Sequence, residues 1–495
     1  MYIPYDKIEE YLEEHFNYTK LKEYFYRKKI SQNLKYIEKN EKKVISRLRK
    51  KYSKGKKINV VFYIYDEAKW KCQSLYELLE DNDKFNVKIL VTRNSVVNKE
   101  NPSWQTKRCL KKTYQFFFEK GMNVEYAYDI EKQEHIPFKK FKPDVVIYQH
   151  PWYVETSQGP VVCSKFALTY YVPYYFPTTT APIDYYLRFH RYIENYCVFD
   201  EITKNVYKEK MENKAKNVIV TGQPFLDYFR THHNKGYKYT IYAPHWSICN
   251  QGIAYGTFEW NGKWLLEYAK GHPEMQWVFK PHPLLKKALV DRKVMTEEEV
   301  QNYYEDWNSV GIVYEHGDYL DLFNQSKLLI TDCSSFLGEY FMTENPVIHL
   351  ISKNATPYNE TINQVIKHYY KAECIEHLAE LLSELPTQDY MKEERIKAIE
   401  ELGYKNNNAS QNILNNILEK LSWSFSLKKR ASFFKTYPLF YFYNYACCAC
   451  VIFTACALIF SITLLSFARY SFCIFCSFAW SFKFKPETKF AFVWT

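Results

Sequence analysis

Short apolar runs alternate with stretches of helical periodicity from residue 58 onward. The runs at 58–66 (INVVFYIYD) and 85–93 (FNVKILVTR) are rich in β-branched and aromatic residues, which is typical of buried strands. Residues 69–81 (KWKCQSLYELLED) lie between them and are predicted to form a helix, and the runs at 123–129 and 143–151 continue the alternation. Because strands that alternate with helices form parallel sheets covered by helices, this part of the chain is predicted to be a doubly wound α/β domain.

A second series of the same kind begins near residue 237. Residues 217–229 (NVIVTGQPFLDYF) resemble a strand, a glycine turn and a short helix, so we place the hinge between the two series near them. Two Rossmann-like units in tandem enclose a cleft, into which the carboxyl ends of the strands point. The amphipathic segment 377–421 is expected to close the second domain. The predicted strands of the second series are 237–246, 275–283, 311–316, 327–335 and 345–351, and its helices are 261–273, 318–326 and 336–344.

The two ends of the chain differ from this pattern. Residues 1–57 are charged and helical in pattern, which predicts a solvated helical extension or, alternatively, a basic surface that contacts anionic lipid headgroups. No charged residue occurs from Thr436 to Ala468, a stretch longer than the roughly 20 residues that a spanning helix needs. Basic residues precede it and would lie on the cytoplasmic side. An altered C-terminus and a buried or amphipathic hairpin remain alternatives to a membrane segment.

The predicted organisation therefore has four regions. They are a basic helical extension (1–57), an N-terminal Rossmann-like acceptor domain (58–230), a C-terminal Rossmann-like nucleotide-donor domain (231–425) and a hydrophobic tail (426–495). The formal charge of +11 suits an anionic partner such as a membrane surface, a nucleotide or a phosphate polymer. The cysteines of the first 374 residues have no metal-ligand or disulfide spacing, and the N-terminus has no apolar signal core, so a reduced, cytosolic protein is expected.

The stretch VFKPHPLL (278–285) ends a predicted strand with a histidine between two prolines. Prolines fix their own φ near about −65° and restrict the residue before them, so His282 is held in a stiff turn. The carboxyl end of a strand faces the cleft in this architecture. His282 is therefore a candidate for donating to a phosphate or moving a proton, with a structural turn as the alternative interpretation.

A second polar cluster, TDCSS (331–335), follows a predicted strand and opens a predicted helix. The free N–H groups of a helix start, together with two hydroxyl groups, favour phosphate binding, although a simple helix cap explains one such residue. Glu339 lies one helical turn after Ser335, where its carboxylate could accept both hydroxyls of a ribose; a solvated helix residue is the alternative.

Five elements in order resemble the CDP-glycerol glycerophosphotransferases, the teichoic-acid polymerase and primase group. The resemblance covers residues 200–375 well and residues 58–200 more loosely. It implies a GT-B fold, with two Rossmann-like domains around a nucleotide cleft, and transfer of glycerol phosphate from CDP-glycerol to a growing polymer or lipid-linked acceptor with release of CMP. The elements are VTGQPFLD (220–227), YAPHW (242–246), KPHP (280–283), TDCSS (331–335) and NPVIHL (345–350).

Site residues are carried over by motif. The resemblance implies that His282 assists at the donor phosphates, that Ser334 and Ser335 hold the donor phosphate, and that Asp332 shapes the loop. Glu339 stands where the family pattern often has Asp. The complete donor-binding prediction consists of Lys280, Thr331, Asp332, Ser334, Ser335, Glu339 and His245.

The sequence departs from the family pattern in the first domain. Many members carry a Trp-His-Gly stretch whose histidine looks like the acceptor base, but the corresponding place reads LTYYVPYYF (168–176), as in a capsule-type branch. We predict that His150, in IYQHPW (147–152), serves as a catalytic residue instead; a different base or a plain loop histidine are the alternatives. Tyr171 and Tyr174 could line an acceptor groove or could simply be packed.

The sequence thus predicts a transferase that moves glycerol phosphate, or a related polyol phosphate, from a CDP-activated donor to a capsule or cell-wall glycopolymer. The expected partners are a CDP-polyol, a lipid-linked or polymeric glycan acceptor and an anionic membrane surface, without nucleic acid, metal or cofactor. The expected location is the cytoplasmic face of the membrane, peripherally or through the tail. The alternatives are a GT-B glycosyltransferase that uses a nucleotide sugar and a non-catalytic, membrane-tethered polymer-binding protein.

Overall fold

The computed structural model describes residues 19–422, apart from 94–102, 153, 180–184, 186, 233–236, 316–318, 386–387 and 405–407. The tail predicted at 426–495, together with its membrane segment, lies outside the described residues, as do residues 1–18. None of the helices in the described part of the chain has both the length and the apolar character that crossing a membrane requires.

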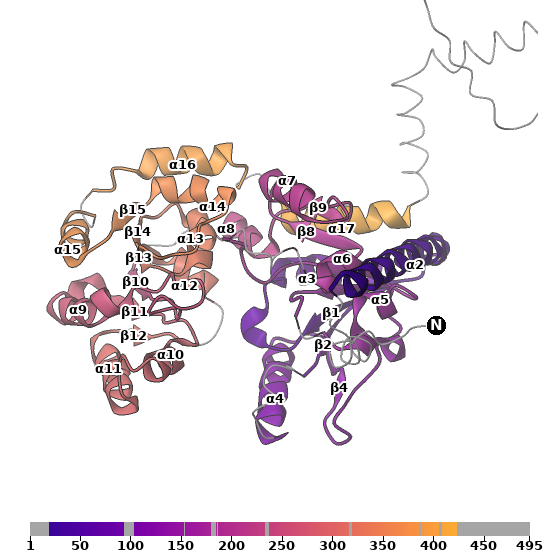
Figure 1. Ribbon diagram of the computed structural model, residues 1–495, viewed down its shortest axis with the longest axis horizontal. Coiled ribbons are helices and arrows are strands. Elements are labelled where there is room, and N and C mark those ends of the chain that lie inside the picture. Colours follow the sequence, from indigo (N-terminus) through magenta and orange to yellow (C-terminus); the bar gives the residue numbers. More distant parts are fainter. Residues whose placement is uncertain are drawn as a thin grey trace, which may run out of the picture. The chain divides into compact units, whose positions relative to one another are not determined.

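A seven-stranded sheet forms the core of the first lobe, a name we use for residues 19–222 with 408–422 (Figure 1). Every neighbouring pair of strands is parallel, and the spatial order β3-β2-β1-β6-β7-β8-β9 reverses direction between β1 and β6. Such a reversal leaves a crevice at the carboxyl ends of the two strands. The strands are β1 (Ile58–Ile64), β2 (Phe85–Val91), β3 (Val124–Tyr126), β6 (Val145–Tyr148), β7 (Leu168–Tyr171), β8 (Asn195–Val198) and β9 (Val218–Val220).

The second lobe, residues 237–404, repeats this arrangement with six parallel strands in the order β12-β11-β10-β13-β14-β15. Its reversal falls between β10 and β13. The doubly wound α/β fold predicted from the alternation of strands and helices is therefore confirmed in both halves. The strands are β10 (Tyr239–Ala243), β11 (Trp277–Phe279), β12 (Ile312–Val313), β13 (Ser326–Thr331), β14 (Val347–Leu350) and β15 (Tyr370–Ala372).

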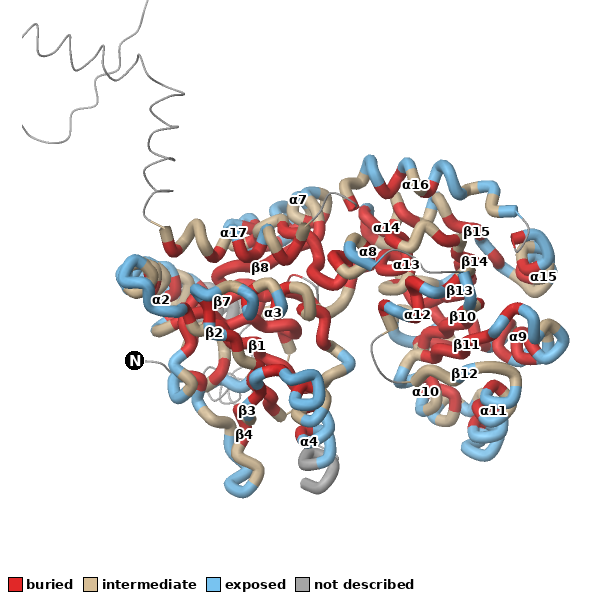
Figure 2. Tube along the Cα trace, turned by 180° about the vertical axis from the view of Figure 1, so that it is seen from behind, coloured by how far each residue is buried: buried red, intermediate tan, exposed pale blue. Residues whose placement is uncertain are grey.

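Helices cover both sheets, and their outward faces are exposed while the strands are buried (Figure 2). In the first lobe and the linker that follows it they are α2 (Thr19–Ser53), α3 (Gln73–Glu80), α4 (Ser103–Glu119), α5 (Pro160–Cys163), α6 (Arg188–Tyr192), α7 (Glu201–Lys210) and α8 (Asp227–Thr231). In the second lobe they are α9 (Phe258–Gly271), α10 (Leu285–Asp291), α11 (Glu297–Val310), α12 (Leu320–Asn324), α13 (Ser334–Tyr340), α14 (Glu360–Val365), α15 (Ile375–Glu384) and α16 (Lys392–Glu401).

The basic helix α2 is packed on the first lobe instead of being solvated all round. Its side chains Ile37, Val44 and Leu48 are buried. On its polar side, Arg47 donates to the buried carboxylate of Asp144 over 2.9 Å. One face of the predicted basic extension therefore belongs to the core of the first lobe.

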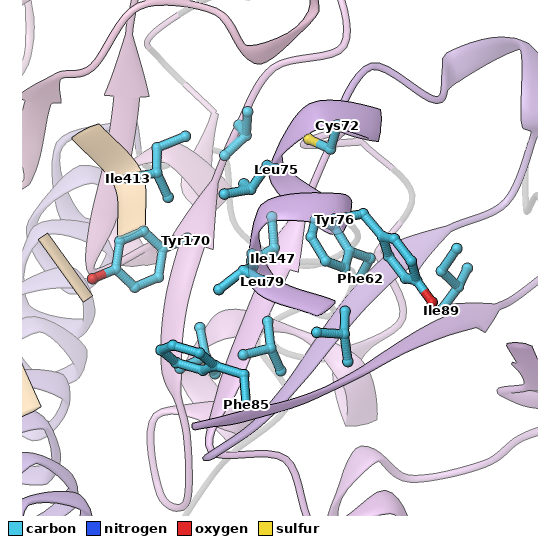
Figure 3. Close-up of a cluster of buried hydrophobic side chains, with 14 of the residues drawn as sticks. Phe62, Cys72, Leu75, Tyr76, Leu79, Phe85, Ile89, Ile147, Tyr170 and Ile413 are labelled. Carbon is cyan, nitrogen blue, oxygen red and sulfur yellow. The ribbon is translucent and has the colours of Figure 1, made fainter. Parts of the chain in front are cut away.

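The last described helix, α17 (Ala409–Leu421), corrects the expectation that residues 377–421 close the second domain. It packs against α2 and α3 of the first lobe, where Ile413 lies beside Leu75 and Tyr170 in a common apolar cluster (Figure 3). Its first N–H groups, at residues 409 and 410, donate to Asp227 over 2.9 and 2.8 Å. An amphipathic pattern predicts that one face of a helix is buried, but does not say against which lobe.

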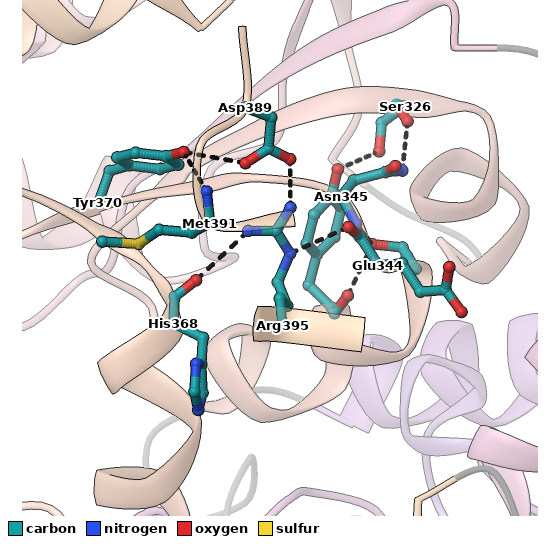
Figure 4. A network of polar contacts seen from close by, with 10 residues as sticks. Ser326, Glu344, Asn345, His368, Tyr370, Asp389, Met391 and Arg395 are labelled. Atoms are coloured by element: carbon teal, nitrogen blue, oxygen red, sulfur yellow. Dashed lines mark hydrogen bonds and ion pairs between the residues drawn. The ribbon is translucent and has the colours of Figure 1, made fainter. Parts of the chain in front are cut away.

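Helices α15 and α16 do cover the second lobe, and a fully buried arginine fixes α16 in place (Figure 4). Arg395 forms an ion pair with Asp389 and donates from Nε to the Glu344 carbonyl oxygen over 2.9 Å. Because a buried guanidinium needs partners for its donors, these contacts set the position of the helix.

Candidate active site

A pocket of about 680 Å³ lies where the loops after β1, β10, β11 and β13 meet. These are the carboxyl ends of strands at, or next to, the two reversal points, which is where ligands bind in such sheets. The first lobe contributes Tyr65, Asp66, Glu67, Ala68, Lys69, Lys71, Cys109, Lys112, Thr113, Tyr174 and Tyr175. The second lobe contributes Pro244, Trp246, Lys280, Pro281, His282, Pro283, Leu284, Glu315, Tyr319, Cys333, Ser335, Phe336 and Glu339.

His282 lines this pocket in a rigid turn. Its backbone N–H donates to the Pro244 carbonyl oxygen over 3.0 Å, which ties the turn to the loop after β10. Its ring nitrogen Nδ1 accepts a hydrogen bond from the Leu284 N–H over 3.1 Å, so the proton of the neutral ring is on Nε2. Burial, with the nearby His245, Lys69 and Lys280, holds the pKa of His282 well below its usual value. His282 is therefore a neutral imidazole that can donate from Nε2.

His245 supports His282 from the side and does not line the pocket. The two ring centroids are 5.1 Å apart. Nδ1 of His245 accepts from the Ser247 N–H over 3.1 Å and lies 2.7 Å from the Ser247 hydroxyl oxygen. Burial lowers the pKa of His245 to about 3, so this ring is neutral as well.

Asp332 connects the loop after β13 with the loop after β10, two of the loops around the pocket. Its carboxylate accepts from the His245 N–H over 2.6 Å, from the Thr257 N–H over 2.6 Å and from the Thr257 hydroxyl over 2.7 Å. Burial raises the pKa of Asp332 to about 7, while these donors favour the charged form. Thr331 has a similar structural place, since its hydroxyl donates to the Ala243 carbonyl oxygen over 2.7 Å. Both side chains hold the loops and lie outside the pocket lining.

The two predicted serines point to different places. Ser335 lines the pocket beside Cys333. Ser334 is buried and accepts a hydrogen bond from the Thr178 hydroxyl over 2.9 Å, a contact between the lobes. Only Ser335 of the pair thus shares the pocket with His282.

Buried charges of both lobes meet around Tyr319. The Tyr319 hydroxyl donates to the carboxylate of Glu339 over 2.5 Å, and Nζ of Lys71 lies 3.8 Å from the same carboxylate oxygen. Lys71 and Lys280 lie over the Tyr319 ring, with Nζ 3.8 and 4.6 Å from its centroid. Both lysine side chains are buried, at 6% and 7% exposure. Because an ammonium group is rarely buried without a functional or structural reason, the arrangement favours an anionic ligand.

His150 lies behind the pocket and does not line it. Its ring is packed against Tyr65, with centroids 4.0 Å apart, and Nδ1 is 3.1 Å from the Trp152 carbonyl oxygen. The side chain is 1% exposed, and burial lowers its pKa to about 3. The catalytic role of His150 stays a prediction, and this placement gives it no route to a ligand in the pocket.

The sequence interpretation missed the first-lobe residues Asp66, Lys69 and Lys71. They follow β1 directly, and the position of a charged cluster at the end of the first strand was the signal that could have identified them. The loop is fixed, since the Lys71 N–H donates to the Gln149 side-chain oxygen over 2.8 Å. Among the described residues, no group of three or more His, Cys, Asp or Glu side chains is placed to hold a metal ion.

A family model described as CDP-glycerol:poly(glycerophosphate) glycerophosphotransferase matches residues 25–419. The chain belongs to this family. The resemblance drawn from the five sequence elements is confirmed, and the protein is a transferase enzyme. No curated protein has a sequence that matches this chain.

Several solved structures are similar to this chain. A variant of the wall teichoic acid polymerase TagF, soaked with CDPG, aligns with a TM-score of 0.50 and 14% identity over 79% of this chain and 98% of that one. An S. aureus MnaA–UDP complex aligns with a TM-score of 0.47 and 14% identity, over 74% and 96%. UDP-GlcNAc 2-epimerase from Neisseria meningitidis, bound to UDP-GlcNAc, aligns with a TM-score of 0.44 and 15% identity over 73% of this chain and 100% of that one. The protein has the GT-B fold that the sequence predicted.

Proposed function

We propose that this enzyme transfers glycerol phosphate, or a related polyol phosphate, from a CDP-activated donor to a hydroxyl group of a capsule or cell-wall glycopolymer and releases CMP. The observation that carries this proposal is the pocket itself. Lys280 and His282 from the turn after β11 and Ser335 from the segment after β13 line one cavity together with the carboxylate of Glu339. A diphosphate needs donors of this kind, and a ribose needs an acceptor of its hydroxyl protons.

Each residue has a place in the proposed reaction. The acceptor oxygen attacks the phosphorus that carries the glycerol, and the bond from that phosphorus to the bridging oxygen breaks. Negative charge then develops on the departing CMP phosphate, where Nε2–H of His282 and the Lys280 ammonium group would stabilise it. Both groups are held in place before the donor arrives, so little reorganisation accompanies the reaction.

The acceptor is proposed to be a glycan polymer or its lipid-linked precursor, and the enzyme is proposed to work at the cytoplasmic face of the membrane. This location follows from the acceptor chemistry and from the basic residues near both ends of the chain.

The test is CMP release from labelled CDP-glycerol, measured in the membrane and soluble fractions of cells that make the full chain. Poly(glycerophosphate) oligomers with a free terminal hydroxyl serve as the acceptor. We expect CMP together with an elongated oligomer, mainly in the membrane fraction. CDP-ribitol and ordinary nucleotide sugars are tested in parallel, because release from a nucleotide sugar alone would favour a glycosyltransferase.

His282→Ala is expected to lower the turnover number by about a hundredfold or more, since it removes a donor to the departing phosphate. His232→Ala, an exposed histidine away from the pocket, serves as the control and should keep normal turnover. The proposal would be contradicted if no CDP-polyol released CMP. It would also be contradicted if the His282→Ala variant had a normal turnover number.

A further inference from the structure

The proposed reaction requires a group that accepts the proton of the acceptor hydroxyl. The first-lobe segment 168–176 contains no histidine, and His150 is buried away from the pocket. His282 accepts a hydrogen bond at Nδ1 and can only donate from Nε2 while it is neutral. The remaining candidates are the carboxylates that line the pocket.

Three of the four pocket carboxylates are already engaged. Glu67 contacts Nζ of Lys112 over 2.5 Å and accepts from the Thr113 hydroxyl over 2.8 Å. Glu315 pairs with Nζ of Lys286 over 3.0 Å. Glu339 accepts from Tyr319 and lies beside Lys71, both described above. Each of these three groups would lose a partner if it took up a proton.

Asp66 is different. Its Oδ1 accepts a hydrogen bond from the Ala68 N–H over 3.1 Å, which caps the short 3-10 helix η1 (Glu67–Lys69). Its Oδ2 lies 3.6 Å from Nζ of Lys69, beyond hydrogen-bond distance. The side chain is 34% exposed, and it lines the same pocket as His282. One oxygen of this pocket residue thus accepts a backbone hydrogen bond, while the other lies 3.6 Å from the Lys69 ammonium group.

We propose that Asp66 is the general base of the transfer reaction. This inference rests on the proposed function. The acceptor hydroxyl gives its proton to Oδ2 of Asp66 as its oxygen forms the new bond to the glycerol-bearing phosphorus. The bond from that phosphorus to the bridging oxygen breaks, and CMP leaves with its electron pair. The products are a phosphodiester, CMP and one proton, which Asp66 then passes to water.

The surroundings of Asp66 come from several elements. Lys69 of its own loop neutralises it in part and also lies close enough to influence His282. Tyr65 at the end of β1, Tyr174 of the loop after β7 and Cys109 of α4 experience its charge. The Lys69 ammonium group lies over the Tyr174 ring, with Nζ 4.8 Å from the centroid. The Tyr-x-Pro-Tyr segment that replaces the expected histidine is therefore adjacent to Asp66.

Asp66→Asn in the full chain tests this assignment. The amide keeps the shape and the cap of η1 but cannot accept the proton. We expect the rate constant of transfer to poly(glycerophosphate) oligomers to fall by about 10²–10⁴-fold. The dissociation constant of CDP-glycerol, measured by calorimetry, should change less than threefold, and the acidic limb of the pH–rate profile should disappear.

The chain offers a matched control. Asp129 and Lys132 form a second Asp–Lys pair three residues apart, with oxygen and nitrogen 3.7 Å apart, in the same lobe and outside the pocket. Asp129→Asn should retain the wild-type rate and pH profile. Normal transfer by Asp66→Asn, or loss of CDP-glycerol binding together with transfer, would overturn the role of Asp66 while the wild-type activity still supports the proposed function. A wild-type enzyme that releases no CMP would refute both.

Discussion

At the scale of single residues, His282 and His245 are neutral in the free protein. His282 and His245 both accept a backbone N–H at Nδ1, which fixes the same tautomer in each ring. Burial and neighbouring cations oppose a second proton on His282. A neutral imidazole close to lysines is suited to receive the negative charge of a ligand.

This geometry predicts that CDP binding is coupled to proton uptake. Burial lowers the pKa of His282 in the free enzyme, and the negative diphosphate raises that pKa again by stabilising the imidazolium ion. At any pH between these two values, binding takes up a proton, so affinity for CDP should increase as the pH falls. Calorimetry in two buffers of different ionisation enthalpy measures the uptake.

His282→Gln should abolish this proton uptake, whereas His232→Ala should leave it unchanged. Equal heats in the two buffers throughout the range from pH 5 to pH 8, in which histidines ordinarily titrate, would show that His282 does not meet the diphosphate.

At the scale of elements, the carboxylate of Asp332 joins the loops of the second lobe that surround the pocket. Asp332 follows β13, and its partners His245 and Thr257 lie on the loop after β10 and at the start of α9. The adjacent parallel strands β10 and β13 bring these loops together. The position of the pocket thus depends on hydrogen bonds between side chains and backbone groups outside the pocket lining.

Asp332→Asn is expected to lower the free energy of unfolding by about 2–4 kcal/mol, because the amide leaves at least one of three buried donors without an acceptor. Urea unfolding followed by tryptophan fluorescence measures this difference. Asp83→Asn, at an exposed aspartate of the first lobe, is the control and should change the value by less than about 0.5 kcal/mol. Equal stabilities of the two variants would contradict a structural role for Asp332.

Much of the fold could be predicted because the central strands are apolar runs. β1, β2 and β10 fall within predicted ranges, and β13 begins one residue before its predicted range. The strands β7, β8 and β15 escaped prediction, since they have only three or four residues each and many tyrosines occur throughout this chain. At the site, His282, Lys280, Ser335 and Glu339 were predicted from motifs and line one pocket. Asp66 and Lys71 belong to no motif, and only the folded sheets bring them opposite His282.

At the scale of the whole molecule, side chains of the two lobes pack against each other. Phe176 of the first lobe packs so closely against α13 that a Cβ atom on Gly338 would lie 2.8 Å from its ring. Phe199 contacts Tyr404 of the second lobe, with ring centroids 4.5 Å apart. Lys71 adds a charged contact to this apolar interface, because it reaches Glu339 and Tyr319 from the loop after β1.

Lys71→Met should raise the KM for CDP-glycerol about tenfold, since the apolar side chain keeps the packing but removes a positive charge from the pocket. A tenfold change corresponds to about 1.4 kcal/mol. Steady-state kinetics with the oligomer acceptor measures the effect. Lys88→Met, which removes the partner of Glu125 on the surface of the same lobe, should leave KM unchanged. An unaltered KM for both variants would mean that Lys71 serves only the interface.

The return of α17 to the first lobe has a consequence for protein synthesis. A ribosome releases the second lobe in full before residues 409–421 emerge, yet Ile413 and its neighbours belong to the apolar cluster of the first lobe. The half that is made first is therefore the half that is finished last. Until α17 emerges, the apolar surface that it covers on the first lobe is exposed to solvent. We expect chaperones to bind the nascent chain during this interval.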